Sequence, residues 1–297
     1  MTLKQAYDEF MFQKELAGLA PASLSDYRNI ITIMLNHVGA SIDLESVTYE
    51  VVTEYIMTLL RRPLAKATIS TYIRNTRIFL RWVYAEYGLS FDPVKIKVPK
   101  SPKRIVHIYS DTEIQYLFSC VQTSIPWLTA RNRAIIALML DSGIRQCEVC
   151  KLLWNNVDFE RMVLKVQGKG SKERLVSLGY MSKILLNDYF SLCPFKDSEN
   201  VFLDRLGGPL SVNAIRLFVN RLKKQLPFDL SSHKLRHNFA TNYCIDNIRK
   251  YGNTNVYDLS ILMGHESIET TKKYEHFAHE MIAVENNISH LDKVYKV

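Results

Sequence analysis

A proline-rich, basic segment near residue 100 constrains the fold of this chain more than any other feature. Residues 92–104 read DPVKIKVPKSPKR, with three prolines and five cations, and no acidic residue follows Asp92. Proline interrupts a helix, and like charges extend a chain. The sequence of 297 residues therefore predicts a domain of residues 1–92, a basic linker of residues 93–105 that can lie along a polyanion, and a second domain of residues 106–297.

The charge balance points to an anionic partner. The chain has 38 Lys and Arg residues against 30 Asp and Glu residues, a net charge of +8, and its pI is about 9.1. The candidates are nucleic acid and an anionic membrane surface. No apolar run approaches the ~20 residues that a bilayer requires, so a membrane-spanning protein is disfavoured. The five cysteines, an odd number, favour reduced thiols in a cytosol, and Cys147 and Cys150 have no second pair for a zinc site.

The first domain is predicted to contain four helices. Apolar residues recur at steps of three and four, and Thr2 followed by Gln5 is typical of a capping box. Further helices are expected to begin near Pro21, at about residue 49 and at about residue 67. On the last of them, residues 67–87, a second face carries a basic stripe of Arg74, Arg77 and Arg81.

The second domain is predicted to be mostly helical with a small sheet. Ser110 with Glu113 predicts a capped helix to about residue 121, and an apolar helix is expected over residues 132–141, ended by Gly143. The clearest β signal is a hairpin of residues 161–167 and 174–178 around a Gly-Lys-Gly-Ser turn. Further helix starts are expected near Gln146, Met181, Ser211, Ser232 and Ser267. The fold class is therefore mainly α (α+β), with a small antiparallel sheet in the second domain.

Several polar residues of the second domain become informative when their order along the chain is considered. Taken singly, each would more often be a surface, turn or packing residue. Together they lie in five segments: DSGIRQCEV (141–149), GKGSKER (168–174), SHKLRHNFAT (232–241), LMGH (262–265) and TTKKYEH (270–276). This series resembles the tyrosine recombinase (phage integrase) family over nearly the whole chain, in a compact Xer-like form. The resemblance implies a helical core-binding domain followed by a catalytic domain.

The chemistry of DNA strand cleavage is consistent with these residues. A side chain that attacks phosphorus can store the cut strand as an ester, and guanidinium forks can bind the charge that develops on the phosphate oxygens. The resemblance implies that Tyr274 is the nucleophile and that Lys169 protonates the departing 5′ oxygen. It also implies that Arg145 and Arg236 bind the phosphate, that His265 hydrogen-bonds it, and that His233 accepts or relays the tyrosine proton.

Other residues receive supporting roles. We expect Glu148 to orient Arg145, and Lys172 is a rival to Lys169 as the acid. We expect His237 and His276 to be packing residues, or residues that support a neighbouring catalytic side chain, rather than catalysts. The predicted DNA contacts are Arg74, Arg77, Arg81, Lys97, Lys100, Lys172 and Arg174.

The predicted function is that of a site-specific recombinase which exchanges strands through a 3′-phosphotyrosine and a Holliday junction. No metal, ATP or other cofactor is expected. The expected partner is double-stranded DNA, bound by a homotetramer on two duplexes, with a second recombinase or accessory factor as an open question, in the cytoplasm at the bacterial nucleoid. The alternatives are a type IB-like topoisomerase and a catalytically silent DNA-binding regulator. The 29 residues from Arg236 to His265 exceed the family's usual spacing, so we expect an extended loop within residues 246–255.

Overall fold

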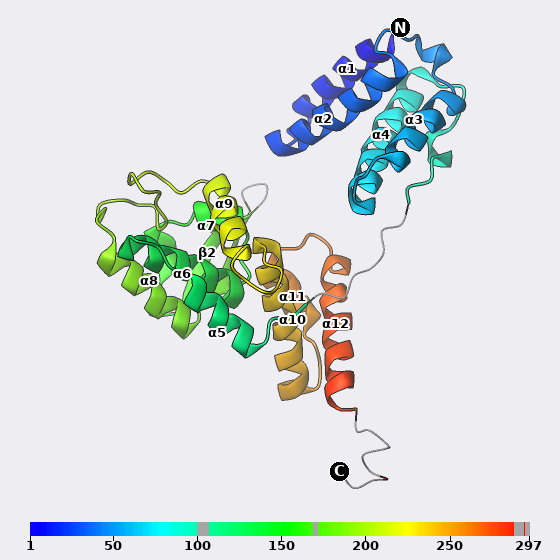
Figure 1. The fold of residues 1–297 in the computed structure, drawn as a ribbon. Coiled ribbons are helices and arrows are strands. Elements are labelled where there is room, and N and C mark those ends of the chain that lie inside the picture. Colours follow the sequence, from blue (N-terminus) through cyan, green and yellow to red (C-terminus); the bar gives the residue numbers. More distant parts are fainter. Residues whose placement is uncertain (100–106, 169–171, 288–293, 295–297) are drawn as a thin grey trace. The chain divides into compact units, whose positions relative to one another are not determined.

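The chain divides into two compact units, residues 1–104 and 105–297. The computed structural model describes residues 1–99, 107–168, 172–287 and 294 (Figure 1). Helices dominate both units, and the three short strands form one antiparallel sheet. The predicted fold class is therefore confirmed. Within the described ranges, no helix combines the length and the apolar character needed to cross a membrane.

The first unit is the predicted four-helix domain. Its first helix begins with the expected capping box, in which the side chains of Thr2 and Gln5 each accept a hydrogen bond from the other's backbone N–H. Pro21 occupies the first turn of the second helix. The elements of this unit are α1 (Leu3–Leu16), α2 (Pro21–Val38), η1 (Leu44–Ser46), α3 (Tyr49–Arg61), α4 (Lys66–Tyr87) and η2 (Pro93–Lys95), where η marks a 3-10 helix.

The core of the first unit is built by the helix faces that the periodicity indicates. On α4, Ile69, Ile73, Leu80 and Val83 are at most 5% exposed. Aromatic side chains of α1 and α4 pack edge to face, since the rings of Phe10 and Phe79 have centroids 5.3 Å apart. The polar face of α4 is left to carry the predicted arginine stripe.

The predicted linker begins too early. Residues 93–95 form η2, which packs on α4, and Ile96 is 2% exposed within the core of the first unit. The carbonyl of Pro99 accepts a hydrogen bond from Ser70 Oγ at 2.7 Å. Apolar residues alternating with the lysines explain this docking, because the chain can bury one side while its charges face water. Residues 100–106 lie outside the described residues.

The second unit carries eight of the described helices and the sheet. The predicted capping box of Ser110 and Glu113 opens α5, and α6 begins at Pro126, earlier than the apolar run alone indicates. Its helices are α5 (Asp111–Cys120), α6 (Pro126–Asp141), α7 (Gln146–Cys150), α8 (Tyr180–Leu192), α9 (Val212–Lys223), α10 (Ser232–Tyr251), α11 (Val256–Met263) and α12 (Glu269–Glu285), with η3 (Trp154–Asn156). The strands are β1 (Val157–Asp158), β2 (Val163–Gln167) and β3 (Glu173–Ser177).

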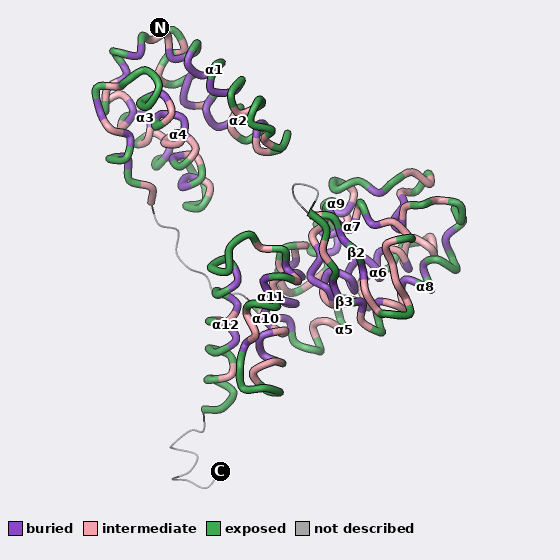
Figure 2. The backbone as a smooth tube through the Cα atoms, turned by 180° about the vertical axis from the view of Figure 1, so that it is seen from behind, coloured by how far each residue is buried: buried purple, intermediate pink, exposed green. Residues whose placement is uncertain are grey.

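The hairpin predicted from the sequence is confirmed. Strands β2 and β3 pair antiparallel, with Leu164 opposite Val176, and both side chains are at most 1% exposed. They join a core that also contains the buried residues of α6 and α8 (Figure 2). The two residues of β1 extend the sheet on the other edge of β2. A strand this short has no alternation that a sequence pattern could reveal.

A second, smaller core of this unit lies among α10, α11 and α12, which contact one another (Figure 1). Phe239 of α10, Leu259 of α11 and Tyr274 of α12 are among the side chains buried there. The predicted catalytic tyrosine is thus part of the packing between three helices.

The extended loop expected within residues 246–255 is wrong for most of its length. Helix α10 continues to Tyr251 and ends at Gly252, whose φ of 75° is left-handed. Residues 246–251 contain no helix breaker, and Arg249 and Lys250 are favoured in a last turn by the negative end of the helix dipole. Most of this segment is therefore helical.

Candidate active site

The first turns of α10 carry three of the polar side chains. Ser231 caps the helix, and its Oγ accepts a hydrogen bond from the backbone N–H of Lys234 at 3.1 Å. His233, Arg236 and His237 follow at spacings of three and four residues, which place them on one face. The rings of His233 and His237 are in edge-to-face contact, with centroids 4.3 Å apart.

Arg236 is almost fully buried, with 3% of its surface exposed. Its guanidinium donates hydrogen bonds to the main-chain carbonyls of Gly143 and Met263. Its Nη2 lies 3.4 Å from Nε2 of His265. Burial, and then repulsion from Arg145, lowers the pKa of Arg236 to about 10, so the group remains a cation at neutral pH.

Arg145 comes from the residue just before α7 and joins the same place. Its Nη1 donates to Oε1 of Glu148 at 2.9 Å, and its backbone N–H donates to the other carboxylate oxygen at 2.6 Å. Its Nη2 donates to the carbonyl of Gly264 at 3.0 Å. Arg236 and Arg145 are therefore held by consecutive carbonyls, of residues 263 and 264, at the end of α11. This shared anchor brings together two cations from distant parts of the sequence.

The turn before Arg145 requires glycine. Gly143 has a φ of +60°, and a Cβ there would lie 2.3 Å from the Phe239 ring. Only glycine combines a left-handed backbone with such a close approach. Because the Gly143 carbonyl accepts a hydrogen bond from Arg236, this turn also fixes one side of the arginine pair.

Glu148 lies beneath the arginine pair, with its side chain 0% exposed. Arg174 donates to it twice, at 2.7 and 2.9 Å, and donates through Nε to the carbonyl of Leu262 at 2.7 Å. The side chain of Arg174 is 10% exposed and its nitrogens bind the protein, and the DNA contact predicted for it stays a prediction. The expected orientation of Arg145 by Glu148 is present.

His265 follows directly after the two anchoring carbonyls. Its Nδ1 is hydrogen-bonded to Oγ1 of Thr271 at 2.7 Å, and its ring is nearly parallel to that of Tyr274, at 14° with centroids 6.3 Å apart. Burial, and then the charges of Arg236 and Arg145, lowers the pKa of His265 to about 4. The ring is therefore neutral at pH 7.

Tyr274 lies on the first turns of α12 and is 2% exposed. Its Oη is hydrogen-bonded to Nδ1 of His237 at 2.6 Å, and Nζ of Lys273 lies 4.8 Å from the centre of its ring. Burial raises the pKa of Tyr274 to about 12, against the opposing effect of Arg236 and Arg145. In the free protein this phenol is therefore protonated and covered, beside two guanidiniums.

The sequence matches the phage integrase family over residues 109–281, which is more than half of the chain. The chain belongs to the phage integrase family. Tyrosine recombinase XerC of Oceanobacillus iheyensis is 29% identical to it over 270 residues, which cover 86% of each protein. This member is accordingly a tyrosine-type site-specific recombinase, and neither a topoisomerase nor a silent regulator is favoured.

Solved structures of integrases share the fold of this family member. The Tn1549 transposon integrase in complex with a circular intermediate DNA matches it with a TM-score of 0.75 and 18% identity, over 92% of this chain and 95% of the other. A lambda integrase tetramer bound to a Holliday junction gives a TM-score of 0.72 and 18% identity, over 90% of this chain and 78% of the other.

The structure brings together most of the side chains that the resemblance to the family indicated. Lys169, the predicted acid, lies outside the described residues, in the segment 169–171. The five that gather around the ends of α11 and α12 and the first turns of α10 are Arg145, His233, Arg236, His265 and Tyr274.

The position of one further histidine could not be fixed from the sequence. His237 was predicted to pack or to support a catalytic side chain, and its ring is hydrogen-bonded to the hydroxyl of Tyr274. The available signal was its position, four residues after His233 on the same helix face and next to Arg236. What the sequence did not contain was the approach of α12 to that face.

The predicted DNA contacts have different surroundings. In the first unit Arg74, Arg81 and Lys97 are exposed, whereas Arg77 is half-buried and donates to the carbonyl of Ile96 at 3.2 Å. In the second unit Lys172 is exposed. Lys100 lies outside the described residues. The exposed cations remain predictions as DNA contacts.

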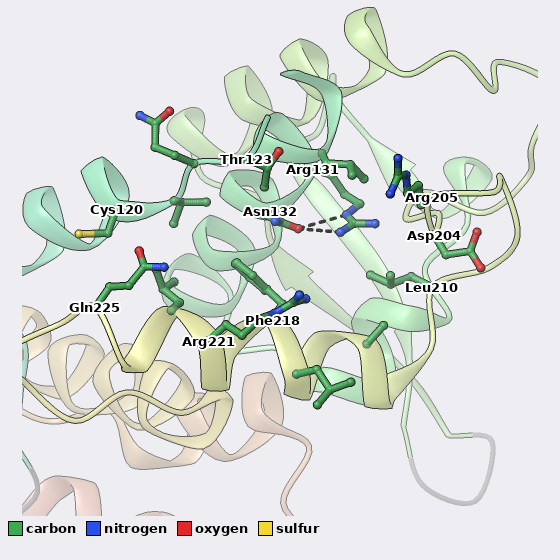
Figure 3. A pocket seen from close by; sticks show the side chains of 16 residues that line it. Cys120, Thr123, Arg131, Asn132, Asp204, Arg205, Leu210, Phe218, Arg221 and Gln225 are labelled. Atoms are coloured by element: carbon green, nitrogen blue, oxygen red, sulfur yellow. Dashed lines mark hydrogen bonds between the residues drawn. The ribbon is translucent and has the colours of Figure 1, made fainter. Parts of the chain in front are cut away.

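A hollow of about 510 Å³ lies elsewhere in the recombinase's second unit, between α6 and α9 (Figure 3). Arg131 and Asn132 of α6 face Phe218 and Arg221 of α9 across it. Arg131 already donates to the carbonyl of Leu203 at 2.6 Å and to Oδ1 of Asn132 at 2.9 Å. Among the described residues that line the hollow, none belongs to the predicted catalytic set.

Proposed function

We propose that this recombinase cleaves DNA by attack of Tyr274 Oη on the phosphorus of a scissile phosphodiester. The bond from phosphorus to the 5′ oxygen breaks, and the strand is stored as a 3′-phosphotyrosyl ester. A 5′ hydroxyl from a second duplex then attacks this ester and releases the tyrosine. Each step exchanges one phosphate ester for another, so the cycle needs no ATP.

The observation that carries this proposal is the shared anchoring of Arg145 and Arg236. Both guanidiniums are held by the consecutive carbonyls of residues 263 and 264, beside His265 and Tyr274. Two fixed cations at one place suit the charge that gathers on the non-bridging oxygens during attack. They supply the charge neutralisation that a metal ion supplies in other phosphoryl-transfer sites, so we propose a reaction without a metal cofactor.

The departing 5′ oxygen needs a proton, and we propose that Lys169 supplies it. The lysine belongs to the segment between β2 and β3 that lies outside the described residues, and the exposed Lys172 follows it closely in the sequence. Changing Lys169 to Ala should slow cleavage of an ordinary phosphodiester far more than cleavage of a substrate with a 5′ thiolate leaving group, which needs no proton. If the 5′ thiolate substrate instead relieves a cleavage defect of Lys172→Ala, Lys172 is the acid.

We propose further that the first unit, residues 1–104, forms a core-binding domain and that two protomers bind inverted half-sites. Two duplexes would then meet in a homotetramer, with or without a second recombinase or an accessory protein, in the cytoplasm at the bacterial nucleoid. The exposed Arg74, Arg81 and Lys97 support phosphate contacts by the first unit. The fold shared with a lambda integrase tetramer on a Holliday junction supports the assembly.

The decisive test traps the chain covalently on nicked suicide substrates, drawn from the DNA that flanks its own gene. The wild-type chain should form a covalent adduct, and Tyr274→Phe should form none while it binds the same DNA with unchanged affinity. Tyr257→Phe, at a tyrosine of α11 that is 69% exposed, is the matched control and should form adduct at the wild-type rate. Adduct formation that survives in Tyr274→Phe would refute the assignment.

A further inference from the structure

The hydroxyl of Tyr274 has one hydrogen-bond partner among the residues that the structure describes. That partner is Nδ1 of His237, at 2.6 Å. His233, to which the resemblance assigned the tyrosine proton, contacts the ring of His237 instead. The group closest to the proton that must leave during attack is therefore a histidine outside the expected set.

We propose that His237 accepts the proton of Tyr274 as the bond to phosphorus forms, and returns it when the strand is rejoined. This inference rests on the proposed role of Tyr274 as nucleophile. His237 touches the reacting oxygen itself, so it would be a catalytic residue. His233 would then act behind it, as the relay that the resemblance allows.

The Oη–H bond of Tyr274 breaks, its proton moves to Nδ1 of His237, and an oxygen electron pair forms the new bond to phosphorus. The electron pair of the broken phosphorus–oxygen bond stays on the 5′ oxygen, which takes a proton from Lys169. In rejoining, the attacking 5′ hydroxyl gives its proton back to Lys169, and the phenolic oxygen recovers its proton from His237.

The surroundings keep His237 in the form that can accept a proton. Burial lowers its pKa to about 3, assisted by the groups that face it: His233 and Arg236 on α10, Lys273 on α12, and His265 after α11. The ring is therefore neutral at pH 7, with one nitrogen free to accept. A bound phosphate would offset the neighbouring cations and raise this pKa.

Proton transfer to His237 can accompany attack because the acidity of the phenol changes as the bond to phosphorus forms. A free phenol releases its proton with difficulty, but an oxygen that is already bonding to phosphorus holds its proton far less firmly. Transfer during bond formation therefore succeeds where prior ionisation would not. The 2.6 Å contact means that no water need carry the proton.

The first test replaces His237 by Asn. The amide oxygen of Asn can take the place of Nδ1 and accept the same hydrogen bond, yet it cannot keep a proton. In single-turnover assays on suicide substrates, His237→Asn should form adduct about 10²–10³-fold more slowly, with unchanged DNA affinity. His276→Asn, on α12 with the wild-type side chain 67% exposed, is the matched control and should cleave at the wild-type rate.

The second test separates proton acceptance from positioning. Tyr274 is replaced by a fluorinated tyrosine, whose phenol is more acidic, in both the wild-type and His237→Asn backgrounds. In His237→Asn, the fluorinated phenol should raise the rate of adduct formation at least tenfold. A 5′ thiolate leaving group should not raise the rate of this variant. Such a pattern places the defect at the nucleophile and separates it from the leaving-group defect of Lys169→Ala.

Two results would overturn the proposal. One is cleavage by His237→Asn at the wild-type rate, and the other is a slow variant that the fluorinated tyrosine leaves slow, which would make His237 a positioning residue only. Should the Asn variant fail to fold or bind DNA, His237→Gln takes its place in the same two tests. If the wild-type chain forms an adduct that Tyr274→Phe loses, the proposed function stands whatever His237 does.

Discussion

At the scale of single residues, the buried carboxylate of Glu148 holds two arginine side chains in place. Glu148 is inaccessible to solvent and is hydrogen-bonded to both Arg145 and Arg174. Burial alone would raise its pKa, but the hydrogen bonds from Arg174 and from the Arg145 backbone outweigh that effect, and the pKa is lowered. The carboxylate is therefore ionised at neutral pH and fixes the orientation of Arg145.

Replacing Glu148 by Gln should destabilise the second unit. The change removes the negative charge and leaves two guanidiniums close together, so the free energy of unfolding should fall by about 3 kcal/mol. Urea unfolding measures this loss, and adduct formation on suicide substrates should slow as well. The exposed pair of Glu269 and Lys272 is the comparison, because Glu269→Gln should leave stability nearly unchanged. Equal losses in the two variants would contradict this account of Glu148.

The turn between α6 and α7 determines how three elements meet. Gly143→Ala should lose about 1 kcal/mol because its φ is left-handed, and about 1–3 kcal/mol more because the new Cβ would meet the Phe239 ring. Gly252→Ala at the end of α10 shares the left-handed φ but faces open space, so only the first loss applies. Urea unfolding of both variants tests the difference. Similar losses would show that Phe239 moves aside without penalty.

The exposed face of α4 should set the salt dependence of DNA binding. The slope of log affinity against log salt is negative, and each phosphate contact removed makes it shallower by about 0.9. Arg74→Gln combined with Arg81→Gln should therefore make the slope shallower by roughly 2 in a titration at several salt concentrations. Arg28→Gln, on α2 and paired with Glu15, is the control from the same unit. A slope unchanged by the double substitution would remove α4 from the interface.

Sequence patterns succeeded where a local interaction decides the structure. Capping at Thr2 and Ser110 and the alternation of the hairpin each depend on neighbours a few residues apart. They failed where distant packing decides. The docking of Ile96 on the first core and the pairing of Arg174 with Glu148 depend on contacts across many residues, and a charged side chain looks the same in a sequence whether it faces DNA or a buried carboxylate.

For the whole molecule, the three histidines near Tyr274 should make stability depend on pH. The pKa of His237 is lowered to about 3, that of His265 to about 4, and that of His233 is also lowered. Unfolding returns each to about 6.5. Between these values the unfolded chain binds more protons, so the stability present above pH 6.5 is lost as the pH falls toward 4.

Urea unfolding followed by tryptophan fluorescence can measure this dependence in the second unit. A Trp82→Phe background leaves Trp127 and Trp154, both of which lie in that unit. The midpoint should fall between pH 7 and pH 5, and His237→Asn should flatten the fall because one titrating ring is gone. Glu148 does not interfere, since its pKa is below the ordinary value of 4.5. A midpoint independent of pH in this range would mean that the rings are accessible to protons in the folded state.

The two carbonyls that hold Arg145 and Arg236 belong to the main chain, and every amino acid has that oxygen. Residue 263 can therefore change among side chains that fill the same space without losing the acceptor, as long as the helix still ends there. Gly264 is less free, since its φ of +58° disfavours most other residues. Substitutions should consequently be tolerated at residue 263 and should impair the protein at residue 264, although both carbonyls hold the same pair of arginines.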